Sequence, residues 1–332
     1  MRHVCIFKPS QYIHQIIHCL NFTLYQPMTT PPYLKPGDII AIVSPAKSIS
    51  AQVISNAKQI IEGFGLKVKI GKHAASIYHQ FAGTDQQRAE DFQQMLDDGE
   101  VKMILCSRGG YGSVRIIDQL DFGHFIKHPK WIVGFSDITV FHSHLYSNFK
   151  IESMHAKMPL NFPENGVGDQ SIKNLFSALA GKSLEYEIPS YPLNRNGTVE
   201  AIIVGGNLSI LCSLLGSCSD IDTDGKTLFI EEVGENLYRL DRMMWTLKRA
   251  GKLSNLSGLV VGGLTSMEDN EVKFGKSAEE IIAESVSEYD YPVCFNFPAG
   301  HQKENYPIII GRTVNLDVSN EVVKLYFSHS KL

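Results

Sequence analysis

The sequence predicts an α/β protein, in which a parallel sheet with helices on both faces precedes a smaller, mixed α/β part. In the first half, short apolar runs alternate with segments of helical spacing, which is typical of a parallel sheet. In the second half, a hairpin pattern near the carboxyl end indicates some antiparallel pairing. Hydrophobic residues make up 43% and charged residues 20% of the 332 residues, so a packed core is expected and a disordered chain is not.

The first half contains strand and helix patterns in regular alternation. Each predicted strand is a short apolar run next to residues that favour turns. These strands are expected at residues 37–44, 66–70, 101–106 and 130–134. Each predicted helix repeats its apolar residues at helical spacing. These helices are expected at residues 50–63, 86–96, 114–120 and 137–149.

A polar, proline-rich stretch at residues 163–196 predicts a linker, after which the pattern changes. Beyond it, strands are expected at residues 197–204, 226–233, 256–263 and 292–297, helices at 207–215, 238–250 and 278–288, and a hairpin of 313–317 with 322–327. The predicted organisation is an extension (1–30), an amino-terminal α/β domain (31–162), the linker, and a carboxyl-terminal domain (197–332).

Charge and cysteine content narrow the possible partners and compartments. The formal net charge is −4 and the sequence has no basic stripe, so nucleic acid is not expected as a partner. The six cysteines form no CxxC pair and no Cys/His cluster with zinc spacing, so no metal site is predicted. Buried free thiols favour a reducing compartment, the cytoplasm. No stretch approaches the length of a membrane span, so no membrane partner is expected.

The chain before Pro31 does not follow the globular pattern. The moderately apolar stretch from Met1 to Gln26 is interrupted by polar residues, and it lacks the unbroken apolar segment of a signal peptide. One interpretation is that Met28 is the true start and that the preceding residues are a poorly ordered extension. A degenerate export signal is the alternative.

A candidate nucleophile, Ser136, stands where a predicted strand passes directly into a predicted helix. Residues 134–137, Gly-Phe-Ser-Asp, match part of a nucleophile elbow, in which a sharp turn exposes the serine hydroxyl. The backbone N–H of Asp137 could then donate to an oxyanion at the amino end of the helix. The second glycine of the motif is absent, and Ile138 takes its place. The alternative is that Ser136 is only a helix N-cap.

A glycine-rich turn, Ser-Arg-Gly-Gly-Tyr-Gly, follows the predicted strand at residues 101–106. Glycines such as Gly109 and Gly110 let a backbone approach a ligand closely or expose its N–H groups. Ligands of open parallel sheets bind at the carboxyl ends of the strands, where this turn is expected. The spacing matches neither the dinucleotide nor the P-loop motif, so phosphate binding and a plain glycine turn both stay open.

Two further candidates, Glu231 and His301, follow apolar strand patterns in the second half. Glu231 lies near the end of its strand, where a carboxylate can orient a histidine. A solvated acid at a strand end is the alternative. His301 follows Gly300 beyond the last predicted strand before the hairpin, and neutral imidazole is a suitable general base near pH 7.

Other histidines and arginines offer rival interpretations. His155 begins a predicted loop and is a rival base, whereas His142 and His144 are expected to be helix-face residues. Arg239 and Arg242 lie on an amphipathic helix, where packing and ion pairs are their expected role. Either arginine could alternatively hold a substrate carboxylate with two hydrogen bonds.

An ordered set of short motifs spans roughly residues 31–317. These motifs are Pro36-Gly37-Asp38 with Ser44-Pro45, Arg108 to Gly112, Gly134 to Thr139, Gly205-Gly206-Asn207-Leu208, Leu228 to Gly234 with Tyr238 to Arg242, and Gly300-His301. Together they resemble the LD-carboxypeptidase family of serine peptidases, family S66. That family includes muropeptide LD-carboxypeptidases and the microcin C self-immunity hydrolases.

The resemblance implies a Ser-His-Glu triad, in which Ser136 is the nucleophile, His301 is the base and Glu231 orients the base. It implies a flavodoxin-like amino-terminal domain that carries the serine and a smaller carboxyl-terminal domain that carries the other two residues. The oxyanion would lie between the backbone N–H of Asp137 and one from the turn at Gly109 and Gly110. No metal or cofactor is implied, and a homodimer is typical of the family.

The implied substrate is a muropeptide, cut at the L,D-bond before its terminal D-alanine during peptidoglycan recycling. Two alternatives stay open: a hydrolase of microcin-like peptidyl or aminoacyl nucleotides, and a peptide-binding protein without catalysis. The sequence departs from the family after His155, where Gly-Pro is common and Ala156-Lys157 is found here. That loop borders the implied active site, so the departure bears on substrate preference.

Overall fold

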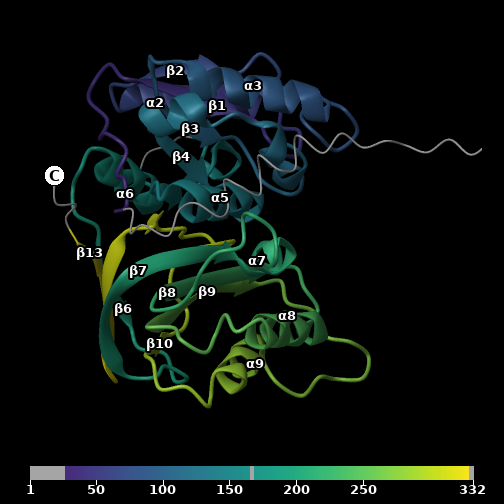
Figure 1. The fold of residues 1–332 in the computed structure, drawn as a ribbon, viewed down its shortest axis with the longest axis vertical. Helices are drawn as coiled ribbons and strands as arrows, with labels where there is room; N and C mark the ends of the chain where they lie inside the picture. Colours follow the sequence, from purple (N-terminus) through teal and green to yellow (C-terminus); the bar gives the residue numbers. More distant parts are fainter. Residues whose placement is uncertain (1–26, 165–167, 329–332) are drawn as a thin grey trace, which may run out of the picture.

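The computed structural model describes residues 27–164 and 168–328, and it confirms the predicted α/β fold class. Figure 1 shows two halves, with the amino-terminal sheet and its helices above and the second sheet below. Residues 1–26, most of the predicted extension, lie outside the described residues. Thr29 pairs in parallel with Ile151 through a backbone bridge, so the end of the predicted extension is part of the fold.

The first sheet has six strands in the order β11-β5-β4-β3-β1-β2. They are β1 (Ile39–Val43), β2 (Lys67–Ile70), β3 (Val101–Cys106), β4 (Trp131–Gly134), β5 (Ser153–His155) and β11 (Ile308–Ile310). Neighbours are parallel except for β11, which runs antiparallel to β5 at the edge. The order β2-β1-β3-β4-β5 is that of a flavodoxin-like doubly wound sheet, which the resemblance implied.

Helices cover both faces of this sheet. They are α2 (Ala51–Gly63), α3 (Asp85–Asp97), α4 (Gly123–Lys127), α5 (Thr139–Phe149) and α6 (Gln170–Leu179), with the 3-10 turns η1 (Ser113–Arg115), η2 (Ile117–Gln119), η3 (Ser136–Ile138) and η4 (Pro159–Asn161). Ile40 and Ile42 of β1 share an apolar cluster with α2 and α6, whereas Ala41 and Val43 share one with α3 and α5. Burial on both sides explains the continuous apolar run of β1.

The second sheet has seven strands in the order β10-β9-β8-β7-β12-β13-β6. They are β6 (Glu185–Pro189), β7 (Gly197–Asn207), β8 (Thr227–Val233), β9 (Gly258–Thr265), β10 (Val293–Cys294), β12 (Thr313–Val318) and β13 (Val322–Phe327), with helices α7 (Leu208–Leu214), α8 (Leu237–Arg249) and α9 (Ala278–Ser285). β7 to β10 pair in parallel, and the remaining pairs are antiparallel. The predicted hairpin is confirmed as β12 and β13.

Polar side chains set where two of these helices begin. At α3, the Thr84 side chain accepts from the backbone N–H of Gln87, and the Gln87 side chain accepts in return. Ser277 and Glu280 form the same capping box at α9. Each box satisfies backbone N–H groups that have no partner inside the helix, so both starts follow from local sequence.

The predicted linker at residues 163–196 contains regular structure, which corrects the sequence interpretation. It includes α6, whose residues Ile172, Leu175 and Leu179 are buried in the apolar cluster of the first sheet. It also includes β6, the edge strand beside β13. The apolar pattern of α6 is short, and the polar and proline residues on either side of it favour a linker in the sequence interpretation. The predicted helix at residues 114–120 is likewise two 3-10 turns, η1 and η2.

Strands β5 and β11 were not predicted, because three residues are too few to show a strand pattern. β11 comes from the predicted carboxyl-terminal domain, yet it completes the edge of the first sheet. We propose that the two sheets are the cores of two domains, with β11 crossing between them.

Buried polar contacts join the two halves. Arg312, just after β11, donates from Nη2 to Glu152 Oε2 at 2.5 Å and from Nε to Glu152 Oε1 at 3.1 Å. The backbone N–H of Asn207, at the end of β7, donates to Thr139 Oγ1 at the start of α5 over 2.9 Å. The carboxyl ends of β4 and β7 are therefore held together. In the part of the chain that the structure describes, no helix is long and apolar enough to cross a membrane.

Candidate active site

Ser136 occupies a strained turn between β4 and α5. Its φ is +64°, a left-handed conformation that residues other than glycine rarely adopt. The helix-cap interpretation is wrong, because Phe135 rather than Ser136 stands at the cap of η3 and no side chain caps either η3 or α5. A serine held in such backbone strain at a strand-to-helix turn is what a nucleophile elbow requires.

The glycine-rich turn lies directly against this elbow. A β-carbon on Gly109 would lie 3.1 Å from Ser136 Oγ and 3.2 Å from the backbone nitrogen of Asp137. Only a residue without a side chain leaves that space open. A plain glycine turn would not need to lie against Ser136, so the position of Gly109 favours a role in ligand binding. Gly110, the next residue, has a φ of +106° and is exposed.

Asp137 fastens the turn to the elbow. Its Oδ2 accepts from the backbone N–H of Ser113 at 2.8 Å. Burial raises the pKa of the Asp137 carboxyl, and the Ser113 hydrogen bonds oppose that rise. The backbone N–H of Asp137 lies in the first turn of η3, where N–H groups have no acceptor within the helix. It is therefore available to a ligand oxygen beside Ser136.

His301 and Glu231 form a hydrogen-bonded pair from the second half of the chain. His301 Nδ1 lies 2.6 Å from Glu231 Oε2, and the His301 backbone N–H donates to the same oxygen over 3.2 Å. Glu231 is fully buried at the end of β8, whereas the His301 side chain is 21% exposed. Gly300 has a φ of +106°, and a β-carbon there would lie 2.7 Å from Glu231 Cβ, so the backbone before His301 can pack onto the acid.

This pairing controls the charge of the imidazole. Desolvation lowers the pKa of His301, but the hydrogen bond and the charge of Glu231, with the charge of Glu232, outweigh it. The net pKa of His301 is therefore raised above its ordinary value. Because Nδ1 is bonded to Glu231, Nε2 is the nitrogen that remains to accept a proton.

The two halves of the site meet through Phe135. Its ring centroid lies 4.8 Å from that of His301, and Phe135 is the residue directly before Ser136. The structure thus brings the serine elbow and the imidazole pair side by side. Among the described residues, Ser136 and the His301 ring form no direct hydrogen bond. Catalytic hydrogen bonds are often long before substrate binds, so this geometry is compatible with a nucleophile and its base.

The rival base His155 and the helix residues His142 and His144 are all buried. His155 ends β5 with no exposed surface, and desolvation holds its pKa well below the ordinary value. His142 lies on α5, as expected, and its ring nitrogens contact Ser153 Oγ and the Gly134 carbonyl. Burial lowers the pKa of His142 to about 4.

Lys157, one of the two residues that depart from the family pattern after His155, forms an ion pair. Lys157 Nζ lies 2.5 Å from Asp169 Oδ2, and both side chains are largely buried. Asp169 also caps α6 by accepting from the backbone N–H of Ile172. Lys157 therefore ties the loop after β5 to the start of α6.

Sequence reasoning missed the residues that support His301. Gly300 N–H donates to Asn305 Oδ1 at 2.9 Å, and Asn305 N–H donates to Ser171 Oγ of α6 at 3.0 Å. Asn305 is buried, and no motif singled it out. In the sequence it stands between Glu304 and Tyr306, in a polar stretch that gives no sign of a buried supporting residue. Phe135 belongs to the motif at residues 134–139, but its contact with His301 could not be predicted, because the two residues are far apart in sequence.

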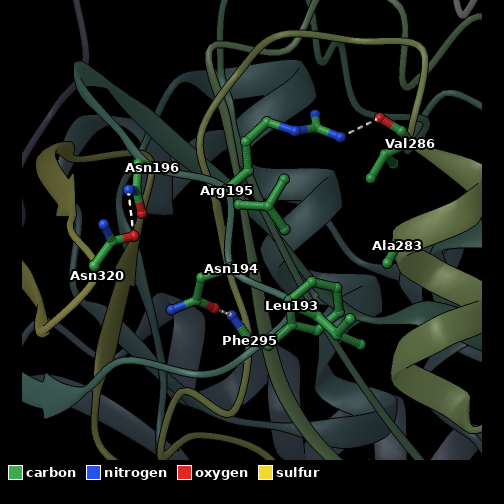
Figure 2. A pocket seen from close by; sticks show the side chains of 9 residues that line it. Leu193, Asn194, Arg195, Asn196, Ala283, Val286, Phe295 and Asn320 are labelled. Carbon is green, nitrogen blue, oxygen red and sulfur yellow. Dashed lines mark hydrogen bonds between the residues drawn. The ribbon is translucent and has the colours of Figure 1, made fainter.

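A separate cavity of about 480 Å³ lies between the segment before β7 and α9 (Figure 2). Its polar groups already have partners within the chain. Arg195 donates to the carbonyls of Tyr289 and Val286, and Asn196 donates to Asn320. None of the predicted site residues lines it. The described residues also contain no cluster of His, Cys, Asp or Glu that could hold a metal ion.

Both halves of the chain match models of one known protein family. Residues 40–156 match the family model described as the LD-carboxypeptidase N-terminal domain, and residues 200–316 match the LD-carboxypeptidase C-terminal domain. The probable murein peptide carboxypeptidase of Bacillus subtilis (strain 168) is 32% identical over 297 residues. That alignment covers 88% of this chain and 92% of the relative.

Solved structures share the same fold. The crystal structure of muramoyltetrapeptide carboxypeptidase from Oxalobacter formigenes has a TM-score of 0.80 at 24% identity, covering 87% of this chain and 98% of that one. The microcin C7 self-immunity protein MccF, in complex with aspartyl sulfamoyl adenosine, also has a TM-score of 0.80, at 19% identity. It covers 90% of this chain and 98% of its own.

Proposed function

Because the chain belongs to the LD-carboxypeptidase family, we propose that it is a serine carboxypeptidase that removes the terminal D-alanine from murein tetrapeptides. The proposed catalytic residues are Ser136, Glu231 and His301. The observation that carries the proposal is the 2.6 Å contact of His301 with Glu231, placed beside Phe135 at the strained Ser136 turn. A nucleophile, a base and an orienting acid are the components of a triad.

In the proposed acylation step, His301 Nε2 takes the proton of Ser136 as Oγ attacks the scissile carbonyl carbon. Glu231 holds Nδ1–H, so it fixes the tautomer and stabilises the imidazolium that forms. Collapse of the tetrahedral intermediate breaks the peptide bond. His301 returns the proton to the departing amine, and D-alanine leaves with an acyl-enzyme behind it.

Backbone groups near Ser136 are suited to the oxyanion. The proposed donors are the N–H of Asp137 and one from the turn at Gly109 and Gly110, because the space beside Gly109 adjoins both Ser136 Oγ and the Asp137 nitrogen. Donors aimed at developing negative charge stabilise the transition state more than the ground state. In deacylation, His301 activates a water molecule that attacks the ester, and Ser136 regains its proton.

The substrate is tested by incubating the protein with L-Ala–γ-D-Glu–meso-diaminopimelate–D-Ala. We expect stoichiometric release of D-alanine and a tripeptide, measured by coupled D-amino-acid oxidation and mass spectrometry. The same assay with the last residue as L-alanine is the control, and it should release little. Absence of D-alanine release by folded protein would contradict the proposed activity.

The second candidate is a hydrolase of aminoacyl nucleotides, favoured by the fold shared with MccF. An aspartyl sulfamoyl adenosine assay separates the two candidates. Under the main proposal, kcat/KM for the tetrapeptide exceeds that for the nucleotide. The reverse order would replace the main proposal with this one.

The resemblance supports two wider proposals, a cytoplasmic location and a homodimer. Cys106 and Cys294 are buried free thiols, which is consistent with a reducing compartment. The dimer rests on the resemblance to the family alone.

Gly109→Ala is expected to lower kcat/KM for the tetrapeptide by about 10²-fold, comparable to losing one oxyanion donor. The new methyl group would sit 3.1 Å from Ser136 Oγ and 3.2 Å from Asp137 N, where the oxyanion must lie. Gly99→Ala is the matched control, because a β-carbon there meets nothing within 4 Å. Equal kinetics of the two variants would remove Gly109 from the site.

A further inference from the structure

Two cations beside the glycine-rich turn have no carboxylate partner. Lys47 lies in the loop after β1, half-buried, with its aliphatic stem against Gly110. The position of a β-carbon on Gly110 lies 2.6 Å from Lys47 Cδ and 3.0 Å from Lys47 Cε. The ammonium is one bond beyond Cε. Within residues 27–164 and 168–328, no Asp or Glu oxygen lies within ion-pair distance of it.

Arg108, in the turn that follows β3, is the second cation. Its Nη1 donates to the Ser48 carbonyl over 2.8 Å, which brings the guanidinium to the residue after Lys47. Its Nε is buried and has no hydrogen-bond partner among the described residues. An unsatisfied buried N–H on a charged group is unfavourable unless a ligand completes it.

Three more deeply buried cations are neutralised by carboxylates. Arg88 pairs with Asp85, Arg312 with Glu152, and Lys157 with Asp169. Each has its counter-charge inside the chain. Lys130, also buried, donates only to the carbonyls of Met95 and Asp98. What sets Lys47 and Arg108 apart is that both lie beside the turn that contacts Ser136.

A carboxypeptidase must recognise a free carboxylate close to the bond that it cuts. Standard backbone dimensions place the terminal carboxylate carbon about 2.5 Å from the scissile nitrogen. Gly110, on which Lys47 lies, is the neighbour of Gly109, which contacts Ser136. Lys47, through Gly110, and Arg108, the residue before Gly109, therefore lie on the turn that contacts Ser136.

We propose that Lys47 and Arg108 bind the terminal carboxylate of the peptide substrate. The planar guanidinium of Arg108 has N–H groups that match two carboxylate oxygens, and Lys47 adds a point charge. This inference rests on the proposed function, because it assigns the part of the substrate that makes the enzyme a carboxypeptidase. It replaces Arg239 and Arg242 as candidate carboxylate ligands, since both are exposed and Arg239 pairs with Glu235.

The test measures binding in a Ser136→Ala background, so it does not depend on turnover. Isothermal titration calorimetry compares the tetrapeptide L-Ala–γ-D-Glu–meso-diaminopimelate–D-Ala with its D-alaninamide form. We expect the acid to bind about 10- to 100-fold more tightly than the amide, the range of one or two charge-assisted hydrogen bonds. Lys47→Met and Arg108→Gln should each reduce this acid-to-amide ratio about 10-fold or more, with little change in amide affinity.

The matched control is Lys127→Met, which removes an exposed lysine from the opposite end of the sheet, before β4. It should leave the ratio unchanged, and thermal unfolding should show that all variants are folded. Equal binding of acid and amide to the parent, or a ratio that survives both substitutions, overturns the carboxylate site. Failure of wild-type protein to release D-alanine, with the binding ratio intact, would instead overturn the proposed reaction and leave this site standing.

Discussion

Ser136→Ala is expected to slow the release of D-alanine from the tetrapeptide by about 10⁴- to 10⁶-fold in kcat, the range for removing a serine nucleophile. The substitution deletes one oxygen and keeps the β-carbon, so the backbone at φ +64° keeps the same steric demand. The oxyanion donors and the proposed carboxylate site stay in place, and substrate affinity should change little. The measurement is single-turnover release of D-alanine, with affinity followed by calorimetry.

Ser143→Ala is the matched control for this result. Ser143 lies on α5, one helical turn beyond Thr139, and its buried Oγ has no hydrogen-bond partner among the described residues. Its replacement should leave the rate within a factor of about two, since no reacting group contacts it. A Ser136→Ala enzyme that released D-alanine at the wild-type rate would show that another group attacks the peptide.

Glu231→Gln is expected to lower kcat on the order of 10³- to 10⁴-fold, the effect of removing the acid that fixes a catalytic histidine. The amide has nearly the same shape as the acid, but its NH₂ group can face Nδ1 and stabilise the wrong tautomer. The negative charge that stabilises the imidazolium is also lost. Steady-state kinetics on the tetrapeptide measure the loss.

The pH profile gives Glu231 a second, independent readout. The proposed base works as neutral imidazole, so activity should rise with pH through the pKa of His301. In the wild type this midpoint should lie above the ordinary value of about 6.5, because Glu231 and Glu232 outweigh desolvation. In Glu231→Gln the charge of Glu231 is gone while desolvation remains, and the midpoint should move to lower pH.

Glu235→Gln serves as the control for both measurements. Glu235 follows the same strand but pairs with Arg239 rather than with His301. Its replacement should leave the rate and the midpoint close to the wild type. An unchanged midpoint in Glu231→Gln would mean that the 2.6 Å contact does not set the charge of the imidazole.

Much of the secondary structure follows from sequence, because its causes are local. The apolar run of β1 and the capping box at Thr84 each depend on residues within a few positions of one another. The same holds for the elbow, since Ser136 stands where a strand pattern meets a helix pattern. Elements without a strong local pattern were missed: β5 and β11 are short, and α6 lies among polar residues.

The sequence by itself determined the alternating α/β order, the position of the serine turn, and the residue types from which a triad could be assembled. Only the tertiary structure decided that His301 bonds Glu231, 70 positions away. It alone also decided that the His301 ring packs against Phe135, the residue before Ser136. It also decided that Lys47 and Arg108 converge on one turn without a counter-charge. These outcomes depend on which strand ends lie at the same edge of a sheet and on how two sheets pack. Such contacts are formed by long-range burial, and spacing along the chain does not encode them.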